Sequence, residues 1–334
     1  MNTLSKRLVF VFIAVLAIAA FLLARRSLTN ETNVVPSQQT QVSSSPSSAQ
    51  LHIGYATETL SNPFWTTVSN GANEVAKTKN VKVTILGSED IEGEVKNAED
   101  LIAQKIDVLV LTPWDAQGII PVVQKANAAG IPVITLDQNA AGGKVETYIA
   151  TDNVLGGKLA GYWLAEAVGG EGNIAILEGK PGATTNNDRL QGFNAIIKTY
   201  PKIKVVASLT ANWKRDQGLK VMSDILSANP SLKAVMAMND EMALGAMEAI
   251  KSANKTDQIL LVGYNGADEA IQQVNKGTMA ADVIQYPEMM GRLMVEWAIR
   301  IKNGETPPAR LNPGVSILDT TAIRKAIKAV KVEQ

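Results

Sequence analysis

The sequence contains no cysteine and only one histidine, and these absences remove several classes of function. Without cysteine the chain has no disulfide, no thiolate metal site, no cysteine nucleophile and no cysteine to carry a lipid after an export signal. A metal site made of several histidines is impossible, and acid–base catalysis by histidine would depend on His52 alone. We therefore expect no metal and no cofactor.

The chain also lacks an excess of charge of either sign. Its 334 residues include 32 Lys and Arg and 32 Asp and Glu, so the formal net charge is zero. Nucleic-acid-binding proteins usually carry a basic excess, so we predict no nucleic-acid partner. Hydrophobic residues make up 46% of the chain, which is ample for packed cores. A chain of this length exceeds what one core usually supports, which favours two domains or one large domain with an appendage.

An apolar segment near the N-terminus indicates export. Lys6 and Arg7 precede an apolar run over residues 8–24, and two arginines follow it. The pattern predicts that residues 1–27 are a signal peptide or an uncleaved N-terminal membrane anchor. Residues 28–50 are mostly Ser, Thr, Gln, Asn and Pro, which is typical of a flexible tether. We expect a periplasmic protein, either free or anchored to the inner membrane by the uncleaved helix.

The rest of the chain alternates short apolar runs with helix-length stretches, the pattern of βαβ units around a parallel sheet. The pattern starts twice, and residues 71–76 before one run resemble residues 192–197 before another. This repeat predicts an α/β protein of two similar Rossmann-like lobes, each a doubly wound parallel sheet. The expected strands are 51–56, 81–86, 107–112, 132–137, 173–178, 203–209, 233–238, 259–263 and 279–284.

Candidate binding residues follow the ends of these strands. Ligands of open α/β sheets sit beyond the carboxyl ends of the strands, so two facing lobes would share one cleft. Aromatic rings there can pack on the C–H faces of a sugar, and planar polar groups can grip neighbouring hydroxyls. The predicted ligand-binding residues are Asn62, Phe64, Trp65, Thr112, Asp137, Gln138, Arg189, Trp213, Asn239, Tyr264, Asn265 and Gln285.

Structural roles remain open for several of these residues. Asn62 suits a helix N-cap, and Phe64 and Trp65 suit the buried face of an amphipathic helix. Asp137 precedes two glycines and suits a turn. Arg189 suits a surface charge in the first turn of a helix, although positive charge is unfavourable there.

Motifs of catalysis are absent, and we predict that the chain is not an enzyme and has no catalytic residues. It contains no Gly-x-Ser-x-Gly elbow, no P-loop and no glycine-rich turn with dinucleotide-binding spacing. The neighbouring carboxylates Asp240 and Glu241 fit the start of a helix at least as well as a glycosidase pair. Trp114 and Trp163 are assigned to packing.

Four ordered motifs give the chain a resemblance to a known family. They are Asn62-Pro63-Phe64-Trp65, the run Ala129-Gly130-Ile131-Pro132-Val133-Ile134-Thr135-Leu136-Asp137, Asp152-Asn153-Val154-Leu155-Gly156-Gly157-Lys158, and Asn239-Asp240-Glu241-Met242-Ala243-Leu244-Gly245. In these motifs, and over about residues 51–318, the chain resembles periplasmic monosaccharide-binding proteins of the ribose-binding type. Those proteins supply ABC importers. The same fold serves lactose-repressor-like regulators, but their N-terminal helix-turn-helix is replaced here by the apolar segment and tether.

The resemblance implies a type I periplasmic binding fold with three hinge crossovers, near Asp152, Gln285 and Pro313. The implied first lobe covers residues 51–152 and 286–313, and the second covers 153–285 and 314–334. Asn62, Phe64, Asp137, Arg189, Asn239 and Gln285 match the ligand positions of the family in residue type, and aromatic residues of the family stand where Trp65, Trp213 and Tyr264 stand here.

Three positions depart from the ribose-binding pattern. Thr112 replaces an asparagine, Gln138 replaces an arginine and Asn265 replaces an aspartate. A buried site matched to one hydroxyl pattern rejects sugars that leave its groups unpaired. The resemblance therefore implies a monosaccharide other than ribose, such as a hexose, another pentose or a polyol.

The expected function is capture of this sugar between two closing lobes and its delivery to the permease of an ABC importer, with the binding protein a monomer. Two alternatives stay open. The chain could be the ligand-binding part of a sensor that reports to a chemoreceptor or kinase, or its ligand could be a nucleoside or a furanone signal.

Overall fold

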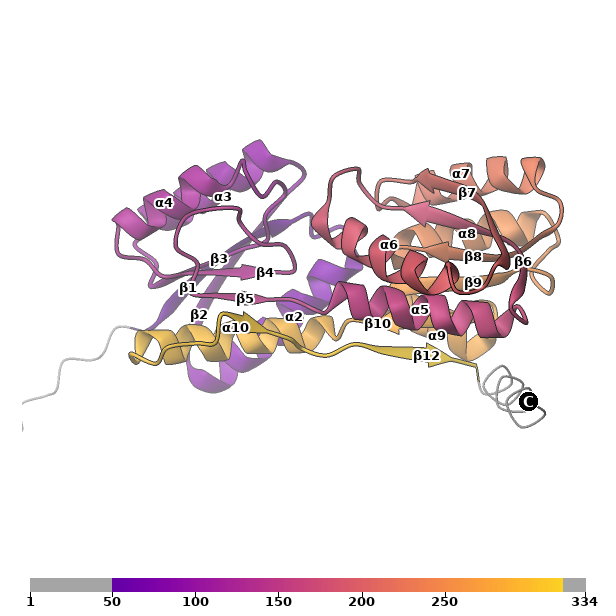
Figure 1. Ribbon diagram of the computed structural model, residues 1–334. Helices are drawn as coiled ribbons and strands as arrows, with labels where there is room; N and C mark the ends of the chain where they lie inside the picture. Colours follow the sequence, from indigo (N-terminus) through magenta and orange to yellow (C-terminus); the bar gives the residue numbers. More distant parts are fainter. Residues whose placement is uncertain (1–49, 321–334) are drawn as a thin grey trace, which may run out of the picture. The chain divides into compact units, whose positions relative to one another are not determined.

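A computed structural model describes residues 50–320 of the chain. The predicted export segment and all but the last residue of the predicted tether lie outside the described residues. Within residues 50–320, no helix combines the length and the hydrophobicity that crossing a membrane would require. The described chain forms two six-stranded sheets, each flanked by helices (Figure 1).

The first sheet is parallel throughout and has the strand order β11-β5-β4-β3-β1-β2. Its long central strands carry apolar side chains on both faces, as expected for a sheet covered on both sides. The strands are β1 (His52–Glu58), β2 (Lys82–Ser88), β3 (Val108–Leu111), β4 (Val133–Leu136), β5 (Thr147–Ile149) and β11 (Arg310–Leu311).

Two helix pairs cover the two faces of this sheet. Helices α2 (Pro63–Lys79) and α10 (Pro287–Lys302) pack on one face, where Phe64, Trp65 and Met294 join the core. Helices α3 (Ile91–Ala103) and α4 (Ile120–Ala128) pack on the other face. The pairing buries alternate residues of each strand on opposite sides, which is the period-two geometry of an extended chain.

The second sheet repeats this arrangement in the order β12-β10-β9-β8-β6-β7, with only β12 antiparallel to its neighbour β10. Its strands are β6 (Glu171–Glu178), β7 (Lys202–Thr210), β8 (Leu232–Ala237), β9 (Leu260–Asn265), β10 (Ala281–Ile284) and β12 (Ser316–Asp319). The helices are α5 (Asn153–Ala167), α6 (Thr184–Ile197), α7 (Arg215–Ala228), α8 (Asp240–Ser252) and α9 (Asp268–Lys276).

The helices that face the strand ends begin at recognisable caps. Asn62 caps α2 because its side-chain oxygen accepts a hydrogen bond from the Phe64 amide, and Pro63 occupies the first helical position. Asn239 caps α8 in the same way through the Met242 amide. These caps place the starts of both helices at the strand ends, which positions the site described below.

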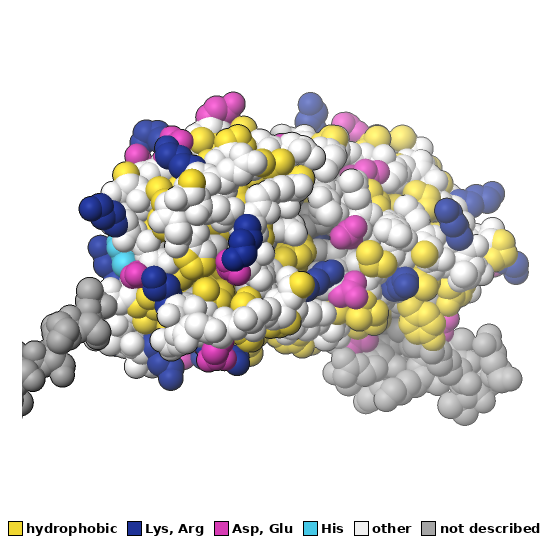
Figure 2. Space-filling view, turned by 60° about the vertical axis from the view of Figure 1, so that its left-hand side comes forward, with side chains coloured by type: hydrophobic (Ala, Val, Ile, Leu, Met, Phe, Trp, Pro, Cys, Tyr) yellow, Lys and Arg dark blue, Asp and Glu magenta, His cyan; other side chains and the backbone are white. Residues whose placement is uncertain are grey.

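The chain passes three times between the two sheets, after β5, after β10 and between β11 and β12. The predicted fold class of two parallel-sheet α/β lobes is confirmed, whereas the lobe boundaries remain a prediction. The short strands β5, β11 and β12 were not among the expected strands. Acidic and basic side chains are interspersed on the face shown in Figure 2, in keeping with the zero net charge.

Candidate functional site

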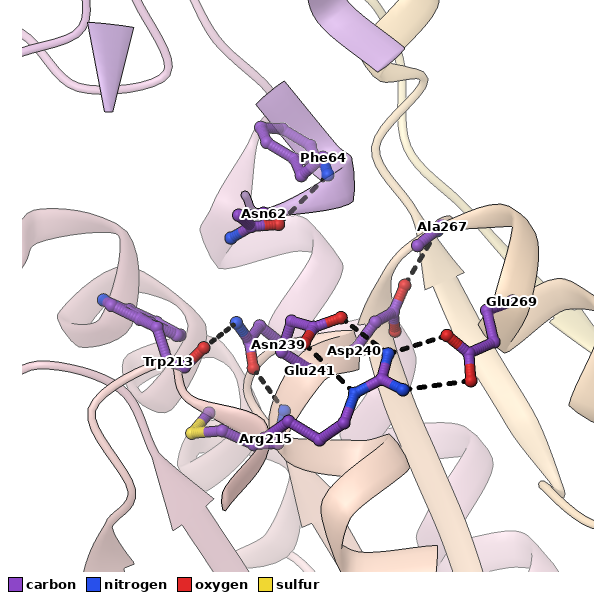
Figure 3. A network of polar contacts seen from close by, with 10 residues as sticks. Asn62, Phe64, Trp213, Arg215, Asn239, Asp240, Glu241, Ala267 and Glu269 are labelled. Atoms are coloured by element: carbon purple, nitrogen blue, oxygen red, sulfur yellow. Dashed lines mark hydrogen bonds and ion pairs between the residues drawn. The ribbon is translucent and has the colours of Figure 1, made fainter. Parts of the chain in front are cut away.

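Most of the predicted ligand-binding residues surround one pocket at the carboxyl ends of the strands of both sheets. The first lobe contributes Asn62, Phe64, Trp65, Asp137 and Gln138. The second contributes Arg189, Trp213, Asn239 and Asn265, and Gln285 lies at the crossover after β10. Asn62 and Phe64 lie across from Trp213 and Asn239 in Figure 3.

Thr112 and Tyr264 are not part of the pocket wall, although both were predicted to bind ligand. Thr112 is fully buried, and its hydroxyl shares a hydrogen bond of 2.9 Å with the hydroxyl of Tyr55. Tyr264 is also fully buried and lies behind Arg189, with the guanidinium carbon 4.0 Å from the centre of its ring. Tyr264 therefore supports a pocket residue from behind.

Aromatic side chains form parts of the pocket wall from both lobes. Phe64 and Trp65 pack edge to face with ring centroids 4.7 Å apart, and each is 4% exposed. Both therefore belong to the core of the first lobe and also line the pocket. Trp213, with a φ of 65°, lies over Gly179, where a Cβ atom would come within 2.0 Å of the indole. Only glycine at position 179 leaves room for this ring.

Arg189 is held rigidly by groups behind the pocket. It is 4% exposed and lies in the second turn of α6. The alternative role of Arg189 as a surface charge in a first helical turn is therefore wrong. Its Nε donates to Asn153 Oδ1 at 2.9 Å, and its Nη1 donates to the Met238 carbonyl. The Tyr264 hydroxyl donates to the same Asn153 oxygen at 3.1 Å. This support leaves part of the guanidinium to face the pocket.

Two buried acceptors in the pocket have no partner among the described residues. They are Oδ1 of Asp137 and Oε1 of Gln285, and the side chains of both are almost fully buried. Burial raises the pKa of Asp137, and the positive charge of Arg189 opposes this shift. Buried polar atoms in folded proteins are nearly always hydrogen-bonded, so these two oxygens are suited to accept hydrogen bonds from the hydroxyls of a ligand.

The amides of the second lobe are oriented by neighbouring groups. Asn239 accepts a hydrogen bond from Met242 and donates its Nδ2 to the Trp213 carbonyl at 3.1 Å. Gln285 Nε2 donates to Asn265 Oδ1 at 2.9 Å. These bonds fix which end of each amide faces the pocket, so donors and acceptors are arranged before a ligand arrives.

Sequence reasoning missed two residues of the pocket wall, Glu58 and Thr185. Glu58 is the last residue of β1 and so lies at a strand end, like the residues that were predicted. Its position at the end of the strand is the sequence signal that could have identified it. Its carboxyl accepts a hydrogen bond from Gln138 Nε2 at 3.2 Å. Burial raises the pKa of Glu58 to about 7, although nearby Lys180 opposes the shift. Thr185 lies in the first turn of α6 and carried no sequence signal.

A larger cavity adjoins the pocket, shares Glu58, Asn62 and Trp213 with it, and is lined from both lobes. This cavity of about 700 Å³ is bordered by Trp114 of the first lobe and by Lys180 and Trp213 of the second, among others. Trp114 was assigned to packing, but its ring lies beneath the ammonium of Lys180, 3.4 Å from the ring centroid. Lys180 follows β6, so this contact joins the two lobes.

The described residues contain no group of three or more His, Asp or Glu side chains that could hold a metal ion. The pocket combines aromatic faces, one arginine, carboxyls and oriented amides. Such a set suits the recognition of a small neutral polyhydroxylated ligand.

Comparison with known proteins identifies the family. Residues 53–306 match the periplasmic binding protein domain, and the chain belongs to this family. The family consists of solute-binding proteins. The predicted family and fold are therefore confirmed.

Two relatives and one further solved structure illustrate the similarity. The ribose import binding protein RbsB of Bacillus subtilis is 38% identical over 87% of this chain and 92% of its own. A periplasmic solute-binding protein of Actinobacillus succinogenes, solved with bound D-allose, is 36% identical, with a TM-score of 0.79 over 83% of this chain and 100% of its own. A carbohydrate-transporter binding protein of Agrobacterium radiobacter, in complex with D-arabinose, is 30% identical, with a TM-score of 0.77 over 85% and 99%.

Proposed function

We propose that this chain is an extracytoplasmic binding protein that captures a monosaccharide between its two lobes and delivers it to an ABC importer. The observation that carries the proposal is the pair of buried, unpartnered acceptors Asp137 Oδ1 and Gln285 Oε1 in a pocket walled by Phe64, Trp65 and Trp213. Hydroxyl donors would satisfy the two oxygens while the C–H face of a sugar ring packs on the aromatic walls.

The relatives support this class of ligand. Relatives that cover most of the chain have names or bound ligands that include ribose, D-allose and D-arabinose. All three are monosaccharides: ribose and arabinose are pentoses that differ in hydroxyl configuration, and allose is a hexose. The shared fold therefore favours a sugar of this size, while the side chains of the pocket select among such sugars.

Among monosaccharides, we propose a hexose, a polyol or a pentose other than ribose. Gln138 occupies the position where the ribose-binding pattern has an arginine. Its neutral amide donates a hydrogen bond to Glu58 and lacks the charged donors of a guanidinium. Asn265 replaces an aspartate and already accepts from Gln285. Both changes replace charged groups by neutral amides, and a site that leaves a ligand hydroxyl unpaired rejects that ligand strongly.

Binding is proposed to act through closure of the lobes. A ligand that touches Asn62 and Asp137 on one side and Arg189 and Asn239 on the other gains contacts in the closed state that the open state lacks. It therefore shifts the population towards closure. The ligand leaves chemically unchanged, the protein works as a monomer in the periplasm, and residues 1–27 serve as its export signal or its anchor.

Binding of sugars by the full-length protein tests the proposal. Isothermal titration against a panel of pentoses, hexoses and polyols should find one sugar with a clear heat of binding. Asp137→Asn should lower the affinity for that sugar about tenfold or more, because a hydrogen bond to a charged group contributes roughly 1.5–3 kcal/mol. Arg189→Ala should weaken it at least as much.

Two matched variants control for effects outside the pocket. Asp100→Asn and Arg300→Ala change the same residue types at exposed positions of α3 and α10 and should bind as wild type. A correctly folded wild-type protein that binds none of the sugars, or variants at 137 and 189 that bind normally, would contradict the proposal.

A further inference from the structure

A buried pair of carboxyls lies directly beneath the pocket residue Asn265. Asp240 is the first residue of α8, and Asp282 lies in β10. They are 1% and 0% exposed, respectively. Neither lines the pocket, so the proposed capture of ligand does not use them directly. Two buried acids in one place still need a physical reason, because burying a carboxyl is costly unless it makes good hydrogen bonds.

Asp240 accepts two hydrogen bonds from the turn that contains Asn265. One carboxyl oxygen accepts a hydrogen bond from the Tyr264 amide at 2.9 Å. The other accepts a hydrogen bond from the Ala267 amide at 2.8 Å, which Figure 3 shows. These two amides flank Asn265 and Gly266. A single side chain therefore closes the turn from both ends.

The turn that Asp240 closes is conformationally unusual. Asn265 has a φ of 145° and Gly266 a φ of 83°, values that side-chain-bearing residues rarely adopt. A residue in such a conformation persists only when surrounding contacts impose it, and such residues are common at binding sites. The hydrogen bonds of Asp240 are among these contacts, and the bond from Gln285 to Asn265 Oδ1 is another.

Gly263 makes the close approach of both acids possible. A Cβ atom at this position would lie 2.6 Å from the nearer Asp240 oxygen and 3.1 Å from an oxygen of Asp282. Neither carboxyl oxygen of Asp282 makes a hydrogen bond of good geometry to another described residue. Burial and the charge of Asp240 raise the pKa of Asp282 well above its usual range. Burial also raises the pKa of Asp240, to about 6, and the hydrogen bonds from the Ala267 and Tyr264 amides oppose this shift. These bonds therefore favour the charged form of Asp240 as the acceptor for the turn.

We propose that Asp240 is a positioning residue for ligand binding: it holds the Asn265–Gly266 turn through the flanking amides of Tyr264 and Ala267 and so aims the Asn265 side chain into the pocket. The inference rests on the proposed function, because it assigns a role in sugar binding to a residue that does not touch the sugar. It adds to that function a residue behind the pocket wall of the second lobe, which fixes the orientation of Asn265.

The first experiment needs no ligand. Hydrogen–deuterium exchange of the full-length protein should show faster exchange over residues 264–267 in Asp240→Asn than in wild type, because the neutral amide accepts more weakly and offers only one oxygen. Asp268→Asn makes the same change at the exposed first residue of α9 and should exchange as wild type. Unchanged exchange in Asp240→Asn would overturn the proposal whatever the ligand is.

The second experiment is a double-mutant cycle on the affinity for the sugar found by titration. Asp240→Asn should weaken binding about tenfold in the wild-type background and have little further effect in Asn265→Ala, because both changes remove the same contact. A role confined to stability predicts the same weakening in both backgrounds, and that result would also overturn the proposal.

A further variant guards against misfolding of Asp240→Asn. Ala267→Pro removes one of the two donors while leaving Asp240 in place, and the φ of −69° at Ala267 suits proline. It should reproduce both the faster exchange and the non-additive loss of affinity. If no sugar binds wild type, the proposed function fails, while the exchange result still decides whether Asp240 holds the turn.

Discussion

Glu58 is a pocket residue whose charge state depends strongly on its surroundings. It lies at the end of β1 beside Asp137, Gln138 and Lys180. Desolvation favours the neutral acid, and Lys180 across the cleft favours the carboxylate. Because desolvation is the larger effect, the pKa of Glu58 rises to about 7.

We predict a pH-dependent cost of folding at Glu58. The pKa in the folded state is higher than in the unfolded chain, so the protonated form stabilises the fold fully below about pH 4.5 and this stabilisation is lost as the pH rises through about 7. The melting temperature of wild type should therefore fall relative to that of Glu58→Gln between pH 5 and pH 8. Glu92→Gln, at an exposed position of α3, is the control and should follow wild type. Parallel profiles of wild type and Glu58→Gln would contradict the prediction.

Pairs of crossing helices hold the pocket residues in place at the scale of secondary structure. Helices α5 and α6 approach so closely that a Cβ at Gly157 would lie 2.1 Å from the Arg189 carbonyl oxygen, and one at Gly192 would lie 2.0 Å from the Val154 carbonyl oxygen. Glycines at corresponding crossings bring α2 against α10 and α7 against α8. Close packing of two helices at glycines therefore occurs in both lobes, as the internal repeat of the sequence suggests.

The close contact of α5 and α6 leads to a prediction about Gly157. Gly157→Ala should push α6 outward and shift Arg189, since overpacking of a tight contact costs about 1–3 kcal/mol. The melting temperature should fall by several degrees, and affinity for the sugar should fall with it. Lys158→Ala, at the exposed neighbouring position, should change neither quantity. Thermal unfolding and titration of the two variants check this, and a Gly157→Ala protein with normal stability would show that the helices can separate freely.

The contact of Lys180 with Trp114 joins the two lobes of the described part of the molecule. Trp114 is fixed in place because its amide donates to Glu94 at 2.8 Å and its indole N–H donates to Ser88 at 3.1 Å. Lys180 reaches this ring from the opposite lobe, 3.4 Å from its centroid. A cation over an indole contributes roughly 0.5–2 kcal/mol, depending on its exposure. Because the contact spans the two lobes, it would favour the closed state in the proposed closure.

Lys180→Met should therefore weaken sugar binding by about twofold to thirtyfold, mainly through faster dissociation, without altering which sugar binds. Stopped-flow measurement of release, with the lobes followed by tryptophan fluorescence, tests this directly. Lys204→Met, at an exposed position of β7, is the matched control. Equal release rates for wild type and Lys180→Met would mean that the contact does not contribute to closure.

Much of the pocket wall follows from local pattern, because the residues at strand ends and helix starts are specified by their neighbours in the sequence. The apolar runs predicted the long strands, and Asn62 was placed at a helix start by its capping chemistry. The short strands β5, β11 and β12 escaped prediction because their sequences, TYI, RL and SILD, are short and partly polar and form no apolar run.

The sequence by itself determined the two-lobed α/β architecture, the family and most of the residues that gather at the strand ends, because periodicity and motifs are properties of neighbouring residues. Only the tertiary structure decided the charge and orientation of those residues. It brought the half-buried Glu58 beside Lys180, placed Tyr264 behind Arg189 rather than in the pocket wall, and set Asp240 beneath Asn265. Burial and hydrogen bonding depend on residues that come together only when the chain folds, and no local pattern records them.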